Sequence, residues 1–115
     1  MRRSEIRLVN LDPALGSEAA RTRPGVIVSN DGANTTAQRL GRGVVTIVPI
    51  TSNIDHIYAF QVLLPAEETG LDVASKAQAE QVRSVAIERV GALLGNVPFH
   101  LMHQLDDALR LHLDL

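Results

Sequence analysis

The sequence contains no cysteine and no tryptophan, and only 3% of its residues are aromatic. The lack of cysteine excludes disulfide bonds, thiolate metal sites and thiol nucleophiles. With so few aromatic rings, the core has to be built from valine, isoleucine, leucine and alanine. Hydrophobic residues make up 45% of the chain, which is a globular composition. We expect one domain over residues 1–115, since a chain of this length can bury a core.

Long apolar runs are missing as well. No stretch approaches the roughly eighteen consecutive apolar residues that a membrane span requires. The basic N-terminus, MRRSEIRLVN, has no apolar segment of signal-peptide length behind it. We therefore expect no membrane partner and a cytoplasmic location.

Charge is nearly balanced, with a net value of −2, but it is distributed unevenly. Residues 1–42 hold seven arginines against four acids, a balance of +3, and residues 43–115 hold four bases against nine acids, a balance of −5. The basic part could form one positive surface for phosphates. Chance scatter in a small sample would produce the same imbalance, and charge alone does not choose between the two.

Several catalytic signatures are absent. The chain has no G-x-x-x-x-G-K-[ST], G-x-G-x-x-G or G-x-S-x-G motif, so nucleotide hydrolysis and serine-hydrolase chemistry lack support. His100 and His103 are three residues apart, but no third ligand completes a known spacing. We expect no metal and no cofactor, and we interpret Asp106 and Asp107 as solvated carboxylates on a helix exterior.

The hydrophobic pattern predicts a mostly antiparallel β domain of about six short strands with a C-terminal helix. The stretch 44–50 is β-branched and apolar almost throughout, which predicts a central strand, although Pro49 argues for an edge position or a bulge near its end. The segment 75–90 is ambiguous, because its composition favours a helix while its apolar residues make no clean helical stripe. On the last helix, Asp106 and Arg110 are predicted to form an i,i+4 ion pair. The other expected elements are strands at 5–11, 25–29, 57–64 and around 93–94, and one or two helical turns at 33–40.

Arg23 stands directly before Pro24 at the start of an apolar run. Arginine is costly to bury, so the residue is either a solvated loop residue or a cation held for an anionic ligand. Gly25 follows, and we expect it to be a flexible link in the strand. Polar clusters end this strand at residues 29–31 and the next at 51–53, and Glu80, Gln81 and Arg83 form another in the ambiguous segment. A β scaffold commonly presents function at such places.

The order of these motifs resembles the MazF/PemK family of bacterial toxins. The matching pieces are E-I-x-x-V-x-L-D-P-x-x-G-S-E, R-P-x-V-I-V-S-N-D, V-x-P-I-T-S-N-I, A-E-Q-V-R-S and L-D-x-A-L-x-L-H-L-D-L, which together span nearly the whole chain. The resemblance implies a mainly β (α+β) fold, a small SH3-like barrel of the kind shared with CcdB, and a homodimer. It implies a sequence-specific, metal-independent endoribonuclease toxin that cuts single-stranded RNA and is neutralised by a cognate antitoxin, MazE-like with an acidic C-terminal tail. It also implies that residues 76–84 form a strand.

The family's catalytic residues fall on Arg23 and Thr51. In metal-free cleavage the ribose 2′-OH attacks the adjacent phosphorus, and charge grows on the non-bridging oxygens. A forked guanidinium suits that charge, and a threonine hydroxyl adds a donor. Arginine is a poor general base because it keeps its proton at neutral pH, so we expect an electrostatic role for Arg23.

The resemblance also implies residues that bind the RNA. Glu18 is expected to orient Arg23 or to contact a base edge, and Glu80 and Gln81 are expected to read bases. An ordinary cross-strand ion pair between Glu80 and Arg83 is an equal alternative. The remaining residues of the predicted binding set are Ser17, Asn30, Ser52 and Asn53.

Two other functions remain open at this stage. A CcdB-like toxin directed at gyrase would need a C-terminal Trp-Gly-Ile, whereas this chain ends Leu113-Asp114-Leu115. A non-catalytic member that only binds an antitoxin is the other alternative.

Overall fold

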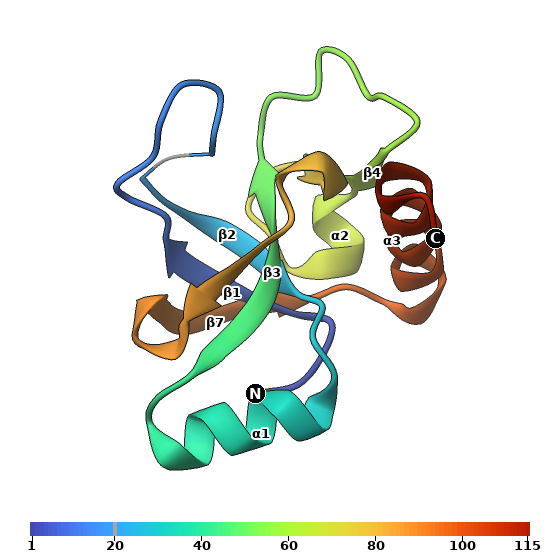
Figure 1. Ribbon diagram of the computed structural model, residues 1–115. Coiled ribbons are helices and arrows are strands. Elements are labelled where there is room, and N and C mark those ends of the chain that lie inside the picture. Colours follow the sequence, from blue (N-terminus) through green and yellow to red (C-terminus); the bar gives the residue numbers. More distant parts are fainter. Residues whose placement is uncertain (20) are drawn as a thin grey trace.

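The structure is a computed structural model that describes residues 1–19 and 21–115. In the described chain, seven strands form one antiparallel sheet, and helices lie around it (Figure 1). The elements are β1 (Glu5–Asn10), β2 (Thr22–Ile27), α1 (Asp31–Leu40), β3 (Val44–Thr51), β4 (Gln61–Leu64), α2 (Ala66–Thr69), β5 (Ser75–Gln78), the 3-10 turn η1 (Ala79–Gln81), β6 (Arg83–Ala86), the 3-10 turn η2 (Ile87–Arg89), β7 (Val90–Asn96) and α3 (Phe99–Leu113).

The strand order is β4-β5-β3-β2-β1-β7, and β6 also pairs with β3. The mainly β class with a C-terminal helix is confirmed, but the expected closed barrel is an open sheet. Among the described strands, no pairing joins β4 to β7. Instead α2 follows β4 and reaches β7, where a Cβ added at Gly95 would lie 2.0 Å from the Thr69 carbonyl oxygen. The end of α2 therefore lies directly against β7.

The central strand is β3, so the edge position suggested by Pro49 is wrong. On one side Pro49 lies opposite Gly25 of β2. On the other side, β6 pairs as far as Ile47, and β5 begins to pair at Ile50. Pro49 thus stands where the partner strand changes, and its missing N–H leaves no ladder hydrogen bond unmade.

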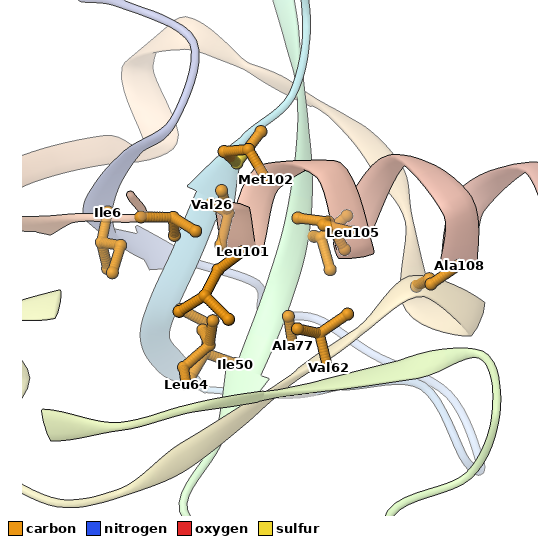
Figure 2. Close-up of a cluster of buried hydrophobic side chains, with 13 residues drawn as sticks. Ile6, Val26, Ile50, Val62, Leu64, Ala77, Leu101, Met102, Leu105 and Ala108 are labelled. Atoms are coloured by element: carbon orange, nitrogen blue, oxygen red, sulfur yellow. The ribbon is translucent and has the colours of Figure 1, made fainter. Parts of the chain in front are cut away.

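Each face of the sheet carries its own hydrophobic cluster. Val26 and Val48 point to one face, and Ile27 and Ile47 point to the other, as strand alternation requires. Helix α3 covers the first face with Leu101, Met102, Leu105 and Ala108 (Figure 2). The second face is covered by Ala37 of α1 and by Leu11 and Ala19 of the β1–β2 loop.

Several elements differ from their predicted bounds. The first helix is longer than predicted because the Asn30 side chain accepts a hydrogen bond from the Ala33 amide at 2.8 Å, and Gly41 ends the helix with a φ of +66°. The ambiguous segment forms two strands, β5 and β6, interrupted by η1. The predicted strand at 57–64 is confined to β4, and residues 52–60 are a loop. No helix of the described chain has the length and apolar character to cross a membrane.

Candidate functional site

Arg23 belongs to β2 and is not a loop residue. The strand begins at Thr22, and Arg23 pairs with Val9 of β1. Its side chain is partly buried. Pro24 follows within the same strand, opposite Leu8. The guanidinium therefore projects from a paired strand, which limits the directions in which it can point.

Thr51 is the last residue of β3, the strand that pairs with β2. Gly25 of β2 pairs with Pro49 of β3. Arg23 comes two residues before Gly25, and Thr51 comes two residues after Pro49, so both lie beyond this pair at the same end of the two strands. Side chains two residues apart point to the same face, so Arg23 and Thr51 share one face of the sheet. Both residues border a hollow of about 410 Å³, to which Thr22, Pro24, Ile50, Ser52, Gly70, Leu71, Asp72, Val73, Ser75 and Leu94 also contribute.

Gly25 is a fixed part of this strand, and its expected role as a flexible link is wrong. It is buried and pairs with Arg7 on one side and with Pro49 on the other. A Cβ at this position would meet Val9 Cγ2 at 3.3 Å and Ile47 Cδ1 at 3.6 Å. The glycine therefore gives room to the second hydrophobic cluster, and β2 stays rigid behind Arg23.

Two long loops leave the sheet at the same end, on either side of these residues (top of Figure 1). They are the β1–β2 loop, residues 11–21, and the β3–β4 loop, residues 52–60. Among the predicted binding residues, Ser17 and Glu18 are exposed on the first loop, and Ser52 and Asn53 are exposed on the second. The structure thus gathers Arg23, Thr51 and these four residues at one end of the sheet.

The β3–β4 loop is ordered from its first residue. The Asn53 amide donates to Thr51 Oγ1 at 3.3 Å, which leaves the hydroxyl hydrogen of Thr51 able to donate elsewhere. Lys76, the single lysine of the chain, is buried, and its Nζ donates to the His56 carbonyl oxygen at 2.5 Å. Because Lys76 is the cross-strand partner of Thr51, this bond ties the loop to the strand pair that carries Thr51. The structural role of Lys76 was not predicted from the sequence, although it is the one lysine in the chain and so stands out.

Aromatic rings support the same loop. Tyr58 and Phe60 stack with their centroids 5.3 Å apart, His56 packs against Tyr58, and His112 of α3 packs against Phe60. Two of the three aromatic residues of the chain are therefore used to attach this loop to the last helix.

The other three predicted binding residues hold parts of the protein to each other. Asn30 caps α1. Glu80 accepts a hydrogen bond from Gln61 Nε2 at 2.7 Å, and its other carboxylate oxygen is buried without a partner in the described chain. Gln81 contacts the β1–β2 loop through both ends of its amide. None of the three lines the hollow.

The alternative ion pair between Glu80 and Arg83 is not formed among the described residues. Arg83 instead donates to the Leu11 carbonyl oxygen at 3.4 Å.

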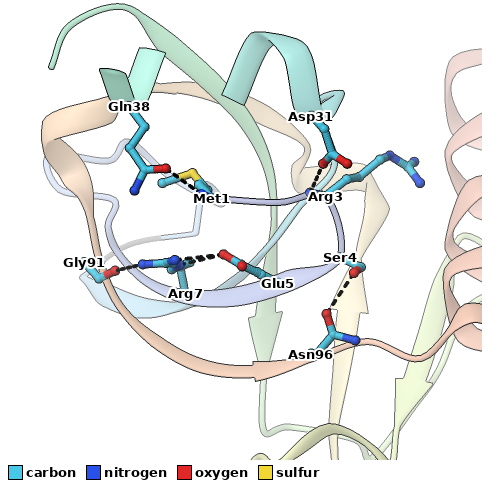
Figure 3. A network of polar contacts seen from close by, with 9 residues as sticks. All are labelled: Met1, Arg3, Ser4, Glu5, Arg7, Asp31, Gln38, Gly91 and Asn96. Atoms are coloured by element: carbon cyan, nitrogen blue, oxygen red, sulfur yellow. Dashed lines mark hydrogen bonds and ion pairs between the residues drawn. The ribbon is translucent and has the colours of Figure 1, made fainter. Parts of the chain in front are cut away.

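At least three of the seven arginines in the basic N-terminal part form ion pairs. Arg2 pairs with Asp31 at 3.4 Å and Arg3 with Asp106 at 2.5 Å. Arg7 donates to Glu5, its neighbour on β1, at 2.8 Å (Figure 3). Among the lining residues of the hollow, Arg23 is the positively charged one.

The carboxyl group of Glu5 is perturbed by these neighbours. Burial raises its pKa, but hydrogen bonds from Arg7 and from the Arg2 backbone, together with nearby positive charges, outweigh that effect. The net result is a pKa below the ordinary value of 4.5.

The two neighbouring histidines of α3 have separate partners. His100 Nε2 lies 3.0 Å from a carboxylate oxygen of Glu68, and His103 packs edge-on against Phe99 at a centroid distance of 4.6 Å. Among residues 1–19 and 21–115, no three His, Cys, Asp or Glu side chains gather in a group that could hold a metal ion.

Residues 2–113 match the family described as PemK-like, MazF-like toxin of type II toxin-antitoxin system. Endoribonuclease MazF9 of Mycobacterium tuberculosis is 63% identical over 115 residues, which cover 100% of this chain and 98% of that protein.

Solved structures share the fold. A crystal structure of MazF from Deinococcus radiodurans superposes with a TM-score of 0.83 at 23% identity, over 100% of this chain and 97% of that one. An endoribonuclease in complex with its cognate antitoxin from a mycobacterial species superposes with a TM-score of 0.75 at 20% identity, over 100% and 96% of the two chains. The resemblance seen in the sequence is thereby confirmed, together with the enzyme class it implied: the chain belongs to the PemK-like, MazF-like toxins of type II toxin–antitoxin systems.

Proposed function

We propose that this protein is a metal-independent, sequence-specific endoribonuclease toxin that cleaves single-stranded RNA by attack of a ribose 2′-OH. The observation that carries the proposal is that Arg23 of β2 and Thr51 of β3 border the same hollow, at the end of the sheet where two loops with exposed polar side chains leave it. The 63% identity to Endoribonuclease MazF9 supports the choice of substrate. A gyrase-directed or non-catalytic toxin is not favoured, because the relatives that match the full chain are endoribonucleases.

In the proposed reaction, the 2′-oxygen forms a bond to the adjacent phosphorus while the bond from phosphorus to the 5′-oxygen breaks. The products are a 2′,3′-cyclic phosphate and a 5′-hydroxyl. The proton of the 2′-OH leaves to a base or to solvent, and the departing 5′-oxygen gains a proton. Negative charge on the non-bridging oxygens is greatest midway, so donors aimed at those oxygens lower the barrier.

We assign this stabilising role to Arg23, with Thr51 as a second donor. A guanidinium presents forked donors that match two phosphate oxygens, and its charge is permanent near neutral pH. Thr51 accepts from the Asn53 amide, so its own hydrogen is available for a phosphate oxygen. Ser17, Glu18, Ser52 and Asn53 are proposed to bind the unpaired bases on either side, because they are exposed on the two loops.

The antitoxin is proposed to bind at the hollow that Arg23 and Thr51 border. A structural neighbour of this chain is an endoribonuclease in complex with its cognate antitoxin. An acidic tail would place carboxylates where Arg23 otherwise meets phosphate. A homodimer remains part of the proposal, as in the expectation from sequence.

The direct test is to replace Arg23 with alanine and to incubate the protein with a long single-stranded RNA. We expect the cleavage rate to fall by about 10²- to 10³-fold, the loss typical of removing one donor from a transition-state site. The control is Arg39→Ala on the exposed surface of α1, and circular dichroism checks the fold of both variants. Undiminished cleavage by a folded Arg23→Ala protein contradicts the catalytic assignment, and inhibition by a chelator contradicts metal independence. Sequencing the cut ends identifies the cleavage sequence.

A further inference from the structure

The β1–β2 loop is held by side chains that come from one later segment of the chain. Arg83 Nη1 donates to the Leu11 carbonyl oxygen at 3.4 Å. Arg89 Nη1 donates to the Asn10 carbonyl oxygen at 3.1 Å and to that of Asp12. These contacts hold the near end of the loop, where a backbone hydrogen bond of 2.9 Å from Leu11 to Arg21 also closes its base.

Gln81 holds the far part of the loop. Its Oε1 accepts from the Ala19 amide at 3.0 Å, and its Nε2 donates to the Ser17 carbonyl oxygen at 3.0 Å. The acceptor faces an N–H and the donor faces a C=O, so both polar ends of the side chain are used. The two contacts lie on either side of Glu18. The side-chain amide of Gln81 thus takes the place that the backbone N–H and C=O of a neighbouring strand residue would have in a sheet.

Gln81 is itself firmly placed. It belongs to η1, whose Ala79 is fully buried in the first hydrophobic cluster, and the Val82 amide donates to the Ala79 carbonyl oxygen at 3.1 Å. Ala19 is buried in the second cluster. The amide of Gln81 therefore fixes the backbone on both sides of Glu18 between two packed points, while the Glu18 side chain stays exposed.

We propose that Gln81 is a positioning residue of the RNA site, which aims Glu18 by holding the Ser17 carbonyl and the Ala19 amide, and does not itself read a base. This inference rests on the proposed function, since it assigns Glu18 a contact with RNA. Fixing the loop in advance reduces the ordering that binding would otherwise require. The expected gain is in substrate binding and orientation, because Gln81 does not touch the reacting phosphate.

The first measurement needs no RNA. In Gln81→Met, which keeps the length of the side chain and removes both hydrogen bonds, we expect hydrogen exchange at the Ala19 amide to accelerate about tenfold or more. Gln81→Glu keeps the acceptor for Ala19 and loses the donor to Ser17, so its Ala19 exchange stays closer to wild type. Gln104→Met, at an exposed position of α3, is the matched control and leaves Ala19 unchanged. Unchanged exchange in a folded Gln81→Met protein overturns the proposal, whether or not the wild type cleaves RNA.

The second measurement separates positioning from base reading by a double-mutant cycle. We expect Gln81→Met to lower kcat/KM for RNA about tenfold in the wild type, mainly through KM, and to have little further effect in a Glu18→Ala background. If the loss is as large in the Glu18→Ala background, Gln81 acts on RNA directly and the proposal is wrong. A changed cleavage sequence in Gln81→Met but not in Glu18→Ala leads to the same conclusion. Failure of the proposed function would instead appear as no RNA cleavage by the wild type.

Discussion

Glu5 and Arg7 form a pair on β1 that couples stability to pH. Their side chains are 18% and 19% exposed, and both Nε and Nη2 of Arg7 donate to the same Glu5 oxygen (Figure 3). The folded-state pKa of Glu5 is lowered, so the pair stabilises the protein above the unfolded-state pKa near 4.5. That stabilisation is lost as the pH falls through the lower folded-state value.

We expect Glu5→Gln to reduce the free energy of unfolding at pH 7 by about 1–2 kcal/mol, the range for a charge-assisted hydrogen bond that is mostly shielded from water. The difference from wild type should shrink when urea denaturation is repeated at pH values below the unfolded-state pKa near 4.5, because the unfolded chain then binds a proton that the folded protein resists. A difference that does not change as the pH falls from 7 to well below 4.5 would show that the ion pair is not its cause. Glu88→Gln, at an exposed position, provides the control.

At the scale of elements, α3 is attached to the N-terminus by a long-range ion pair. The predicted pair of Asp106 and Arg110 is replaced by two others. Asp106 binds Arg3 at 2.5 Å with side chains 28% and 34% exposed, and Asp107 binds Arg110 at 3.2 Å in an i,i+3 pair near the surface. Arg3 also donates to the Val28 carbonyl oxygen at 2.8 Å, which orients its guanidinium toward the helix.

These two neighbouring aspartates provide a matched test. We expect Asp106→Asn to lower the free energy of unfolding by about 1 kcal/mol, because it weakens a partly buried, charge-assisted contact. Asp107→Asn should change it by less than about 0.5 kcal/mol, as is usual for an exposed pair. Thermal or urea denaturation of the two variants checks this, and equal effects would mean that the Arg3 contact adds nothing to the attachment of α3.

The elements that could be predicted from sequence are those whose pattern is local. β1 and β3 follow from β-branched and alternating residues, and α3 follows from Leu101, Leu105 and Ala108 on one face. The segment that became β5, η1 and β6 has helical composition, and only its pairing with β3 on both sides of Pro49 makes it extended. Tyr58 and Phe60 alternate as in a strand, yet they serve ring stacking in a loop.

The site divides in the same way. The motif order points to Arg23 and Thr51 as candidates, and the structure places both on paired strands just outside the strand bounds predicted from sequence. The partners of Gln81, Glu80 and Lys76 could not be predicted, because each lies at least 19 residues away in the chain. Such contacts depend on the loops that the fold brings together.

At the scale of the whole molecule, we propose that the acidic tail of the antitoxin and the RNA compete for the hollow that Arg23 borders. We expect the cognate antitoxin to raise the apparent KM for RNA without lowering kcat, and we expect its inhibition to weaken as salt increases, because carboxylates then meet Arg23 in a screened environment. Steady-state cleavage at two ionic strengths measures both effects. An antitoxin whose tail acids are replaced by their amides is the control, and a saturated complex that cleaves at the rate of the free toxin would rule out binding at the same hollow.

The two long loops begin and end on paired strands, and their described residues supply no strand to the sheet. The β3–β4 loop also lies outside both hydrophobic clusters. It is held instead by Lys76 and by the ring contacts of Tyr58 and Phe60, whereas the β1–β2 loop is anchored by Leu11 and Ala19. Exchanging only the exposed residues 52–55 between family members leaves these contacts in place, so we expect it to alter the proposed target sequence without disturbing the sheet.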